Sequence, residues 1–347
     1  MEKSINIIKE TKMHLLIILL FLASCDKQSE ETPFLYTEGT VRIAKWKGDK
    51  KAVVTLQFDD STPGQATLGV PALNKRNIVG TWYINPGRAE FNTYINNWKS
   101  AQSGGQELAN HTMSHTGAST YNEVIYEVGD ASKIIWGMRG HENFGSLIAF
   151  NRGGGTSWNE DDLAKVLEEY KNIDRQSYVG IPVKALSVPS GSDANKMFEI
   201  VPYYLNDSII IRIHFHGIAA ENGNPPYDYG NGAVWINEFE EFLDKLVEVK
   251  DDIWIGGYIA VYKYIKERQT ASISITQLSD DRFTIELTSE MDAKYYNEPL
   301  TILAYLPQEW EDCLIKHNGC EKSHEVQNNV LMFDAIPNKG EISLTKE

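Results

Sequence analysis

The chain has 347 residues, of which 42% are hydrophobic, 11% aromatic and 23% charged, and these globular proportions exclude a disordered chain, a coiled coil and a collagen-like fibre. Lys and Arg number 33 against 48 Asp and Glu, a formal net charge of −15, so binding to nucleic acid through a basic surface is not expected. The length suits one large domain followed by a smaller one.

The N-terminus has the layout of an export signal. Lysines precede an apolar run over residues 15–23, which is about half of the ~20 residues that span a bilayer. The tetrapeptide LASC resembles the lipobox of bacterial lipoproteins, which implies cleavage before Cys25 and lipidation of its sulfur; the alternative is an ordinary signal peptide with an incidental cysteine. We expect a signal peptide over 1–24, a linker over 25–44, and an exported protein anchored by lipid in the cell envelope, in the periplasm or on the outer-membrane surface.

Residues 45–268 alternate predicted strands and helices. The strands are expected at 52–58, 78–84, 106–110, 146–150, 209–215 and 253–255. Helices are expected at 66–77, 91–101, 121–138, after a capping box of Ser157 and Glu160, along an apolar face over 239–247, and at 258–268. This βαβα succession predicts a parallel sheet or barrel, in which chemistry lies at the carboxyl ends of the strands.

Residues 269–347 change to short strands separated by turns. Strands are expected at 271–278, 282–288, 300–306 and 330–336, which predicts an antiparallel module, a small β-sandwich. Cys313 and Cys320 lie in this module, and we expect a disulfide between them, because the compartment to which the protein would be exported permits disulfides. Two free thiols in a short hairpin are the alternative. A zinc site built on these two cysteines is less favoured, because the chain has no second pair of cysteines to complete it.

Three polar clusters follow predicted strands. Asp59 and Asp60 come directly after the first strand and point in different directions if the chain stays extended, so one is available for a metal and the other for a base. A solvated acidic turn is the alternative. In the segment NHTMSH, His111 and His115 have the i, i+4 spacing that places two imidazoles on one face of a helical turn, which suits a metal such as zinc. A polar loop with chance histidines is the alternative.

The third cluster is His214-Phe215-His216-Gly217. Both histidines face the same way on a strand, and a histidine at the carboxyl end of a strand is suited to general acid catalysis. A buried, structurally satisfied histidine is the stronger alternative for His214, and His216 lies at the mouth. One carboxylate and two histidines would give three ligands and an open position, as in catalytic zinc sites.

Four segments occurring in order, LQFDDSTPGQ, GGQELANHTMSHT, AFNRGGGTSW and IIIRIHFHGI, resemble the polysaccharide deacetylase family, carbohydrate esterase family 4. The resemblance covers residues 44–268. It implies a distorted (β/α) barrel with fewer than eight strands, which uses a divalent metal to remove acetyl groups from amino sugars or esterified sugars.

By this resemblance, Asp59 is the catalytic base, Asp60, His111 and His115 are the metal ligands, and His216 is the general acid. The resemblance also assigns Arg152 to orient the base, although Gly153 follows where family members commonly have proline nearby. The aspartate that tunes the acid histidine in the family has no clear counterpart. Aromatic residues that would stack on sugar rings are Trp158, Tyr227 and Tyr229.

The sequence therefore predicts a metal-dependent hydrolase that deacetylates an N-acetylated glycan, such as chitin-like or peptidoglycan chains, or an O-acetylated polysaccharide such as xylan. Zinc is the expected metal, with cobalt, nickel or manganese as alternatives. A glycan-binding surface lipoprotein whose deacetylase barrel has become inactive is the alternative function.

Overall fold

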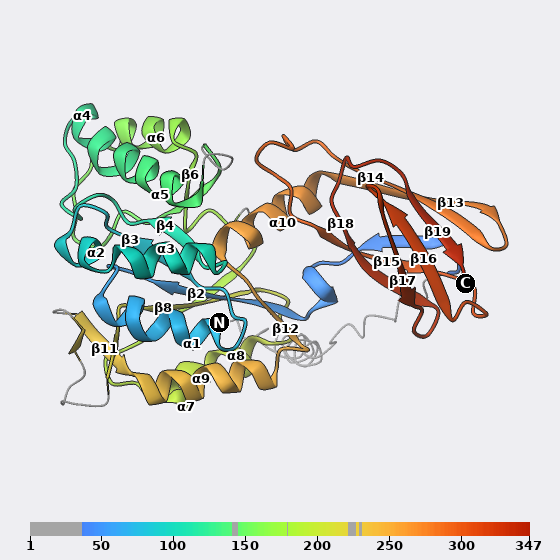
Figure 1. The fold of residues 1–347 in the computed structure, drawn as a ribbon, viewed down its shortest axis with the longest axis horizontal. Coiled ribbons are helices and arrows are strands. Elements are labelled where there is room, and N and C mark those ends of the chain that lie inside the picture. Colours follow the sequence, from blue (N-terminus) through green and yellow to red (C-terminus); the bar gives the residue numbers. More distant parts are fainter. Residues whose placement is uncertain (1–36, 141–144, 179, 221–226, 229–230) are drawn as a thin grey trace, which may run out of the picture. The chain divides into compact units, whose positions relative to one another are not determined.

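The computed structural model describes residues 37–140, 145–178, 180–220, 227–228 and 231–347 (Figure 1). The predicted signal peptide, most of the predicted linker and Cys25 lie outside these residues, so export and lipid anchoring stay predictions. No helix in the described part of the chain is long and apolar enough to cross a membrane.

A parallel sheet forms the centre of the larger part of the chain. Its strands are hydrogen-bonded in the order β6-β5-β4-β3-β2-β8-β7, and β12 also pairs with β2. The two outer strands, β6 and β7, share no ladder in the described residues, so the sheet is a distorted, open barrel, as predicted. The strands are β2 (Ala52–Phe58), β3 (Thr81–Ile84), β4 (Glu107–Asn110), β5 (Ile148–Phe150), β6 (Asn172–Asp174), β7 (Val183–Ser187), β8 (Ile210–Phe215) and β12 (Ile253–Ile255).

Both faces of the sheet are buried at the central strands β2 and β3, as expected for parallel strands covered on two sides, whereas the outer strand β7 is largely exposed. Along β2, Val54 and Phe58 pack into the outer core beneath the helices, whereas Val53 packs with Tyr83 and Ile210 in the inner core. Side chains alternate between the two faces along a strand. Asp59, which directly follows β2 and is six residues after Val53, therefore falls on the same inner side as Val53.

Helices and short turns connect the strands (Figure 1). They are η1 (Lys47–Asp49), η2 (Gln65–Gly69), α1 (Val70–Asn74), α2 (Ala89–Thr93), α3 (Ile95–Ser103), α4 (Tyr121–Val124), η3 (Ile125–Asp130), α5 (Ala131–Arg139), α6 (Glu160–Glu169), α7 (Ala194–Phe198), α8 (Ile200–Tyr204), α9 (Ile236–Glu248) and α10 (Tyr258–Thr270). The cap of α6 differs from the prediction: Asn159, not Ser157, accepts the hydrogen bond from the N–H of Asp162. A small sheet contains β9 (Gly217–Ala219), β10 (Tyr227–Asp228) and β11 (Asn231–Trp235).

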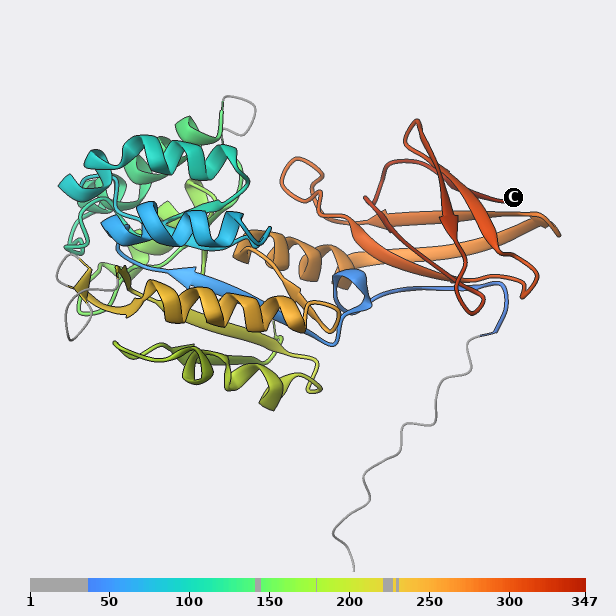
Figure 2. The same cartoon turned by 60° about the horizontal axis from the view of Figure 1, so that its bottom comes forward.

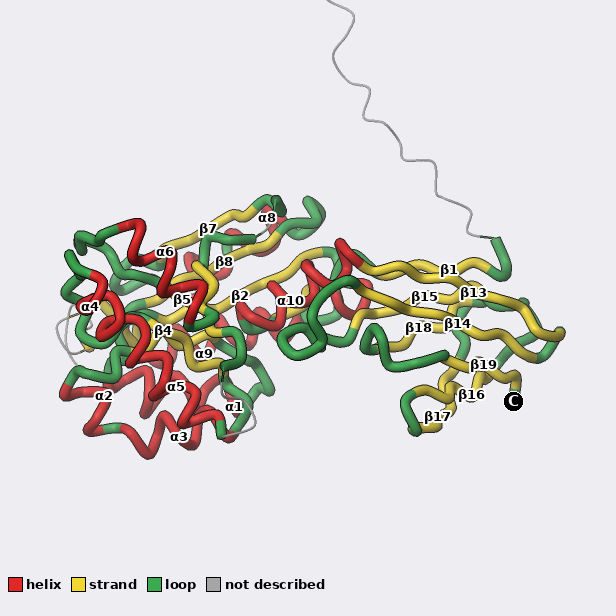
Figure 3. The backbone as a smooth tube through the Cα atoms, turned by 90° about the horizontal axis from the view of Figure 1, so that it is seen from above, coloured by secondary structure: helices red, strands yellow, loops and turns green. Residues whose placement is uncertain are grey.

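The C-terminal part is a β-sandwich that follows α10 directly; Figure 2 shows α10 leading into β13. One sheet has the order β1-β15-β18 and the other β13-β14-β19-β16-β17, and all pairs are antiparallel. Figure 3 shows this part as strands and loops. The strands are β1 (Thr40–Ile43), β13 (Ala271–Ser279), β14 (Arg282–Ser289), β15 (Leu300–Tyr305), β16 (Asp312–His317), β17 (Cys320–Glu325), β18 (Val330–Ala335) and β19 (Ile342–Lys346).

Strand β1 was expected to be part of a linker. It pairs antiparallel with β15, from Thr40 opposite Tyr305 to Ile43 opposite Ile302, and Val41 and Ile43 pack against the core of the sandwich. The sandwich therefore takes an edge strand from the segment before the barrel.

The predicted Cys313–Cys320 disulfide is wrong. Both thiols are free; Cys313 is buried and Cys320 is exposed. In the β16–β17 hairpin, Cys313 lies opposite His324 and Cys320 lies opposite His317, four positions along the ladder. At ~3.4 Å per residue this separation is about 14 Å, well beyond the ~7 Å limit between the Cα atoms of a disulfide.

Candidate metal and catalytic site

The polar side chains gather at the carboxyl edge of the parallel sheet. Six of them occupy the first position after a strand. These residues are Asp59 after β2, Asn85 after β3, His111 after β4, Asn151 after β5, Arg175 after β6 and His216 after β8. Because parallel strands end at one edge of a sheet, residues distant in sequence meet there.

The three predicted metal ligands, Asp60, His111 and His115, lie together, with their ligand atoms all within 4.8 Å of one another. Asp60 Oδ1 is 3.5 Å from His111 Nε2 and 4.0 Å from His115 Nε2. Left-handed backbone at Asp60 (φ 79°) and His115 (φ 63°) turns these side chains toward each other. Gly153 approaches so closely that a Cβ atom there would collide with the His115 ring.

The donor set suits a borderline divalent metal, since zinc binds imidazole nitrogen and carboxylate oxygen. His111 is 1% exposed, and its Nδ1 lies 2.7 Å from the carbonyl oxygen of Asn151. A carbonyl only accepts hydrogen bonds, so Nδ1 carries a proton, and Nε2 is the nitrogen that faces Asp60 and could bind a metal when deprotonated. This is how metal-binding histidines are oriented.

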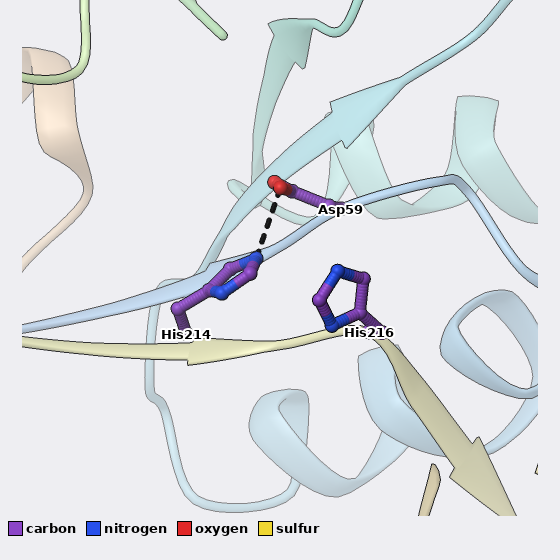
Figure 4. Close-up of side chains that lie close together, drawn as sticks. All are labelled: Asp59, His214 and His216. Carbon is purple, nitrogen blue, oxygen red and sulfur yellow. Dashed lines mark ion pairs between the residues drawn. The ribbon is translucent and has the colours of Figure 1, made fainter. Parts of the chain in front are cut away.

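Asp59 is held differently, because its carboxylate is surrounded by donors. Asn151 Nδ2 donates to Oδ2 at 2.8 Å, Arg175 Nη1 donates to both oxygens at 3.1 Å, and His214 Nε2 lies 2.9 Å from Oδ2 (Figure 4). With its oxygens thus engaged, Asp59 is poorly suited to coordinate a metal. Asp60 differs, because the described nitrogen atoms nearest to its carboxylate are those of His111 at 3.5 Å, Arg88 at 3.7 Å and His115 at 4.0 Å.

The surroundings of Asp59 also fix its charge. Burial alone would raise the pKa of this carboxyl, but His111, His214 and Arg175 together hold the pKa far below its usual range. Asp59 is therefore ionised at neutral pH. The two adjacent aspartates thus differ: one is bound by protein donors, and the other is open.

The prediction for Arg152 is wrong. Its side chain is 45% exposed and pairs with Glu160 at 2.6 Å, away from Asp59. Arg175 takes the expected place on the base carboxylate, and its guanidinium lies 5.6 Å from the ring centroid of Tyr83. The residue that reaches the site from the AFNRGGG segment is Asn151, which contacts both Asp59 and His111.

These contacts predict that one arginine substitution lowers the catalytic rate and that another leaves it almost unchanged. Arg175→Ala removes charge-assisted hydrogen bonds, each worth about 1.5–3 kcal/mol, so the catalytic rate should fall by about 10- to 100-fold. Arg152→Ala removes only an exposed ion pair, and the rate should stay within about twofold of the parent rate. Steady-state kinetics of both variants checks this, and a rate loss only in Arg152→Ala would contradict the assignment.

His214 and His216 lie side by side, with ring centroids 4.7 Å apart (Figure 4). A structural role is the stronger expectation for His214 from the sequence, but its Nε2 lies 2.9 Å from the Asp59 carboxylate. Burial, followed by the charge of His214, lowers the pKa of His216. Asp59, His214 and His216 also have ligand atoms within 4.8 Å of one another.

The predicted aromatic residues do not form one group in the described structure. Trp158 is partly buried beside the cluster of Ala118 and Leu163, and its Nε1 donates to Thr156 Oγ1 at 2.8 Å. The side chain of Tyr227 and all of Tyr229 lie outside the described residues. Stacking of these residues on sugar rings stays a prediction.

The match to a family model agrees with this site. The polysaccharide deacetylase model matches residues 47–200, the segment that contains Asp59, Asp60, His111, His115 and Arg175. Residues 47–200, a little under half of the chain, are therefore similar to the polysaccharide deacetylase family. His214 and His216 follow the matched segment.

Individual proteins are more distant. A gellan lyase from a Bacillus species is 23% identical over an alignment of 351 positions. The alignment covers 89% of this chain but only 13% of the length of that protein. Peptidoglycan deacetylase PdaC from Bacillus subtilis is 17% identical over 62% of this chain and 92% of its own, with a TM-score of 0.38. A family 4 acetyl xylan esterase from Clostridium thermocellum, solved with cobalt, is 16% identical over 60% of this chain and 90% of its own, with a TM-score of 0.40.

Proposed function

We propose that this protein is a metal-dependent hydrolase that removes acetyl groups from a carbohydrate. The observation that carries the proposal is the pairing of an open cluster, Asp60, His111 and His115, with a second carboxylate, Asp59, whose oxygens are occupied by protein donors. A three-residue donor set beside an ionised base suits hydrolysis. The match of this segment to the polysaccharide deacetylase model supports an acetylated glycan as substrate.

Asp60, His111 and His115 would hold the metal, with zinc favoured by two nitrogens and one carboxylate oxygen, and cobalt, nickel or manganese as alternatives. When bound, a divalent ion would supply Lewis-acid polarisation of the acetyl carbonyl and lower the pKa of water. Asn151 steadies both halves of the site, since its amide donates to Asp59 and its carbonyl accepts from His111.

Asp59 would take the proton from the attacking water. His111, His214 and Arg175 keep its carboxylate ionised, and the hydrogen bonds from Arg175 and Asn151 fix its orientation, which is what a general base needs. The proton then has to reach the leaving amine or alkoxide. His216 would donate a proton in that step. Its ring has no hydrogen bond to a described side chain that would hold the proton back, whereas the ring of His214 contacts Asp59.

The role of His216 predicts a dependence on the leaving group. A protonated imidazole with a lowered pKa is a stronger proton donor, and a poor leaving group needs that proton most. His216→Ala should lower the hydrolysis of an N-acetyl sugar by about 10²- to 10⁴-fold. Hydrolysis of an aryl acetate, whose phenolate leaves without protonation, should fall far less. Equal losses on both substrates would contradict the acid role of His216.

The experiment that tests the proposed function is acetate release from chito-oligosaccharides, peptidoglycan fragments and acetylated xylan, with added Zn²⁺ or Co²⁺. Release by the parent protein, and not by an Asp59→Asn variant assayed in parallel, supports the hydrolase and separates N- from O-deacetylation. If metal binds and none of the three substrates is hydrolysed, the glycan-binding alternative is favoured, and binding to the same glycans then tests it.

A further inference from the structure

The two histidines of the metal cluster are joined by a strained loop. Between His111 and His115 the chain passes through left-handed backbone at Thr112 (φ 69°) and again at His115 itself (φ 63°). Residues with side chains adopt this region at an energetic cost, so such a loop persists only where its surroundings hold it. What holds this loop also sets the relative position of the two imidazoles.

The first half of the loop is held by amide side chains. The N–H of Thr112 donates to Asn110 Oδ1 at 2.8 Å, and Asn85 Nδ2 donates to the carbonyl of Thr112 at 3.1 Å. The N–H of His115 donates to Thr112 Oγ1 at 2.9 Å. These bonds fix the chain around His111, and the N–H of Gly87 donates to the carbonyl of Met113 at 2.9 Å, but none of them reaches Ser114 or Thr116.

The second half of the loop is held by one buried carboxylate, Glu127, which is 2% exposed. It accepts from the N–H of Ser114 at 2.9 Å, from Thr116 Oγ1 at 3.2 Å and from the hydroxyl of Ser114. The carbonyl of Glu127 also accepts from the N–H of Met113 at 2.7 Å. One residue therefore bonds the chain on both sides of His115.

Glu127 reaches the loop from an unusual helical segment. It lies in the π-helical turn η3, between α4 and α5. Val124 at the end of α4 and Val128 in η3 are packed in a buried cluster. A π-helical turn contains more residues per turn than an α-helix and is frequent at functional sites. A carboxylate buried in this turn is stabilised only by its hydrogen bonds, so the turn and the loop hold each other.

We propose that Glu127 is a positioning residue for the metal cluster, which holds His115 in place relative to His111 and Asp60. The inference rests on the proposed function, because it assumes that these three residues bind a metal. Partners that lie behind metal ligands typically contribute 10- to 100-fold to metal affinity. Glu127 acts on the ligand loop through the backbone of Met113 and Ser114 rather than by touching a ligand ring.

The test compares metal binding with stability. Apo protein carrying Glu127→Ala should bind Zn²⁺ about 10- to 100-fold more weakly than the parent in a competition titration with a chromophoric chelator. Glu127→Gln should restore affinity to within a few-fold of the parent, because its amide oxygen still accepts from the N–H of Ser114 and hydroxyls also accept from an amide. Ser114→Ala, which removes one donor and leaves Glu127 buried, should give an intermediate loss.

Glu267→Ala is the matched control. Glu267 is 1% exposed and accepts a backbone hydrogen bond from Glu298 at 2.9 Å, so its removal also destabilises the fold, but it lies on α10 outside the cluster. It should lower the unfolding temperature and leave the zinc affinity unchanged. Parent-like zinc affinity in both Glu127→Ala and Ser114→Ala would overturn the inference while leaving the proposed function intact. Absence of zinc binding in the parent would overturn both.

Discussion

An Asp59→Asn variant is expected to lose acetate release by about 10²- to 10⁴-fold while it still binds one metal ion, because a general base contributes that factor. The amide cannot accept the proton of the attacking water. The ligand cluster does not include this side chain, whose oxygens are occupied by Asn151 and Arg175. Rates of acetate release and a metal titration, measured on the same preparation, check the two halves of the expectation.

An Asp244→Asn variant serves as the control, since Asp244 is an exposed acidic residue that pairs with Arg76 on the outside of the barrel. It should leave both the rate and the metal affinity at the values of the parent. Loss of metal from Asp59→Asn, with turnover restored by excess metal, would mean that the roles assigned to Asp59 and Asp60 are exchanged.

A His111→Ala variant is expected to lose metal affinity by more than about 100-fold, because a ligand contributes more than the outer partners that are worth 10- to 100-fold. Acetate release at a fixed low metal concentration should fall in parallel. The His111 ring is buried, and its Nδ1 bonds to Asn151, so no other described side chain occupies its place in the cluster. Isothermal titration of the apo protein with Zn²⁺ measures the change.

His324→Ala is the control for that substitution, since His324 lies on β17 in the sandwich and outside the cluster. It should bind zinc as the parent does. Unchanged zinc affinity in His111→Ala would contradict the assignment of the metal to the Asp60 cluster.

Much of the site is readable from the sequence because its residues are adjacent to elements with strong patterns. Asp59 and Asp60 follow a seven-residue strand that is buried along its whole length, and His111 and His115 are close in sequence. The helical turn expected between the two histidines is wrong, because a loop with left-handed backbone at Thr112 and His115 joins them. The order of strands and helices likewise predicts the parallel sheet. These features depend on residues that are close in the sequence, so a single amino-acid sequence is enough to recognise them.

What the sequence did not predict depends on pairing between distant segments. Arg175 follows β6, a three-residue strand that is defined only by its register with β5. Strand β1 has four residues and gains its place by pairing with β15, some 260 residues away. The separation of Cys313 and Cys320 follows from hairpin register, which their spacing in sequence does not reveal.

A further class of residue was missed because its role depends on a local irregularity. Glu127 reaches the histidine loop from a π-helical turn, and an α-helical pattern over 121–138 gives no sign of that turn. Asn151 was not predicted, because the family resemblance assigns the role to the adjacent Arg152. The three-residue strand β5 is too short to show from sequence which side chain faces inward. In both cases the hydrogen-bond partners, not the residue type, identify the role.

The most direct test of the proposed hydrolase is a titration of metal-free protein with Zn²⁺ while acetate release from an acetylated chito-oligosaccharide or xylan is followed. We expect the rate to rise in proportion to added zinc and to reach a plateau at about one ion per chain, as a single three-ligand site requires. A substantial rate in the metal-free protein, with no increase on adding zinc, cobalt, nickel or manganese, would contradict it.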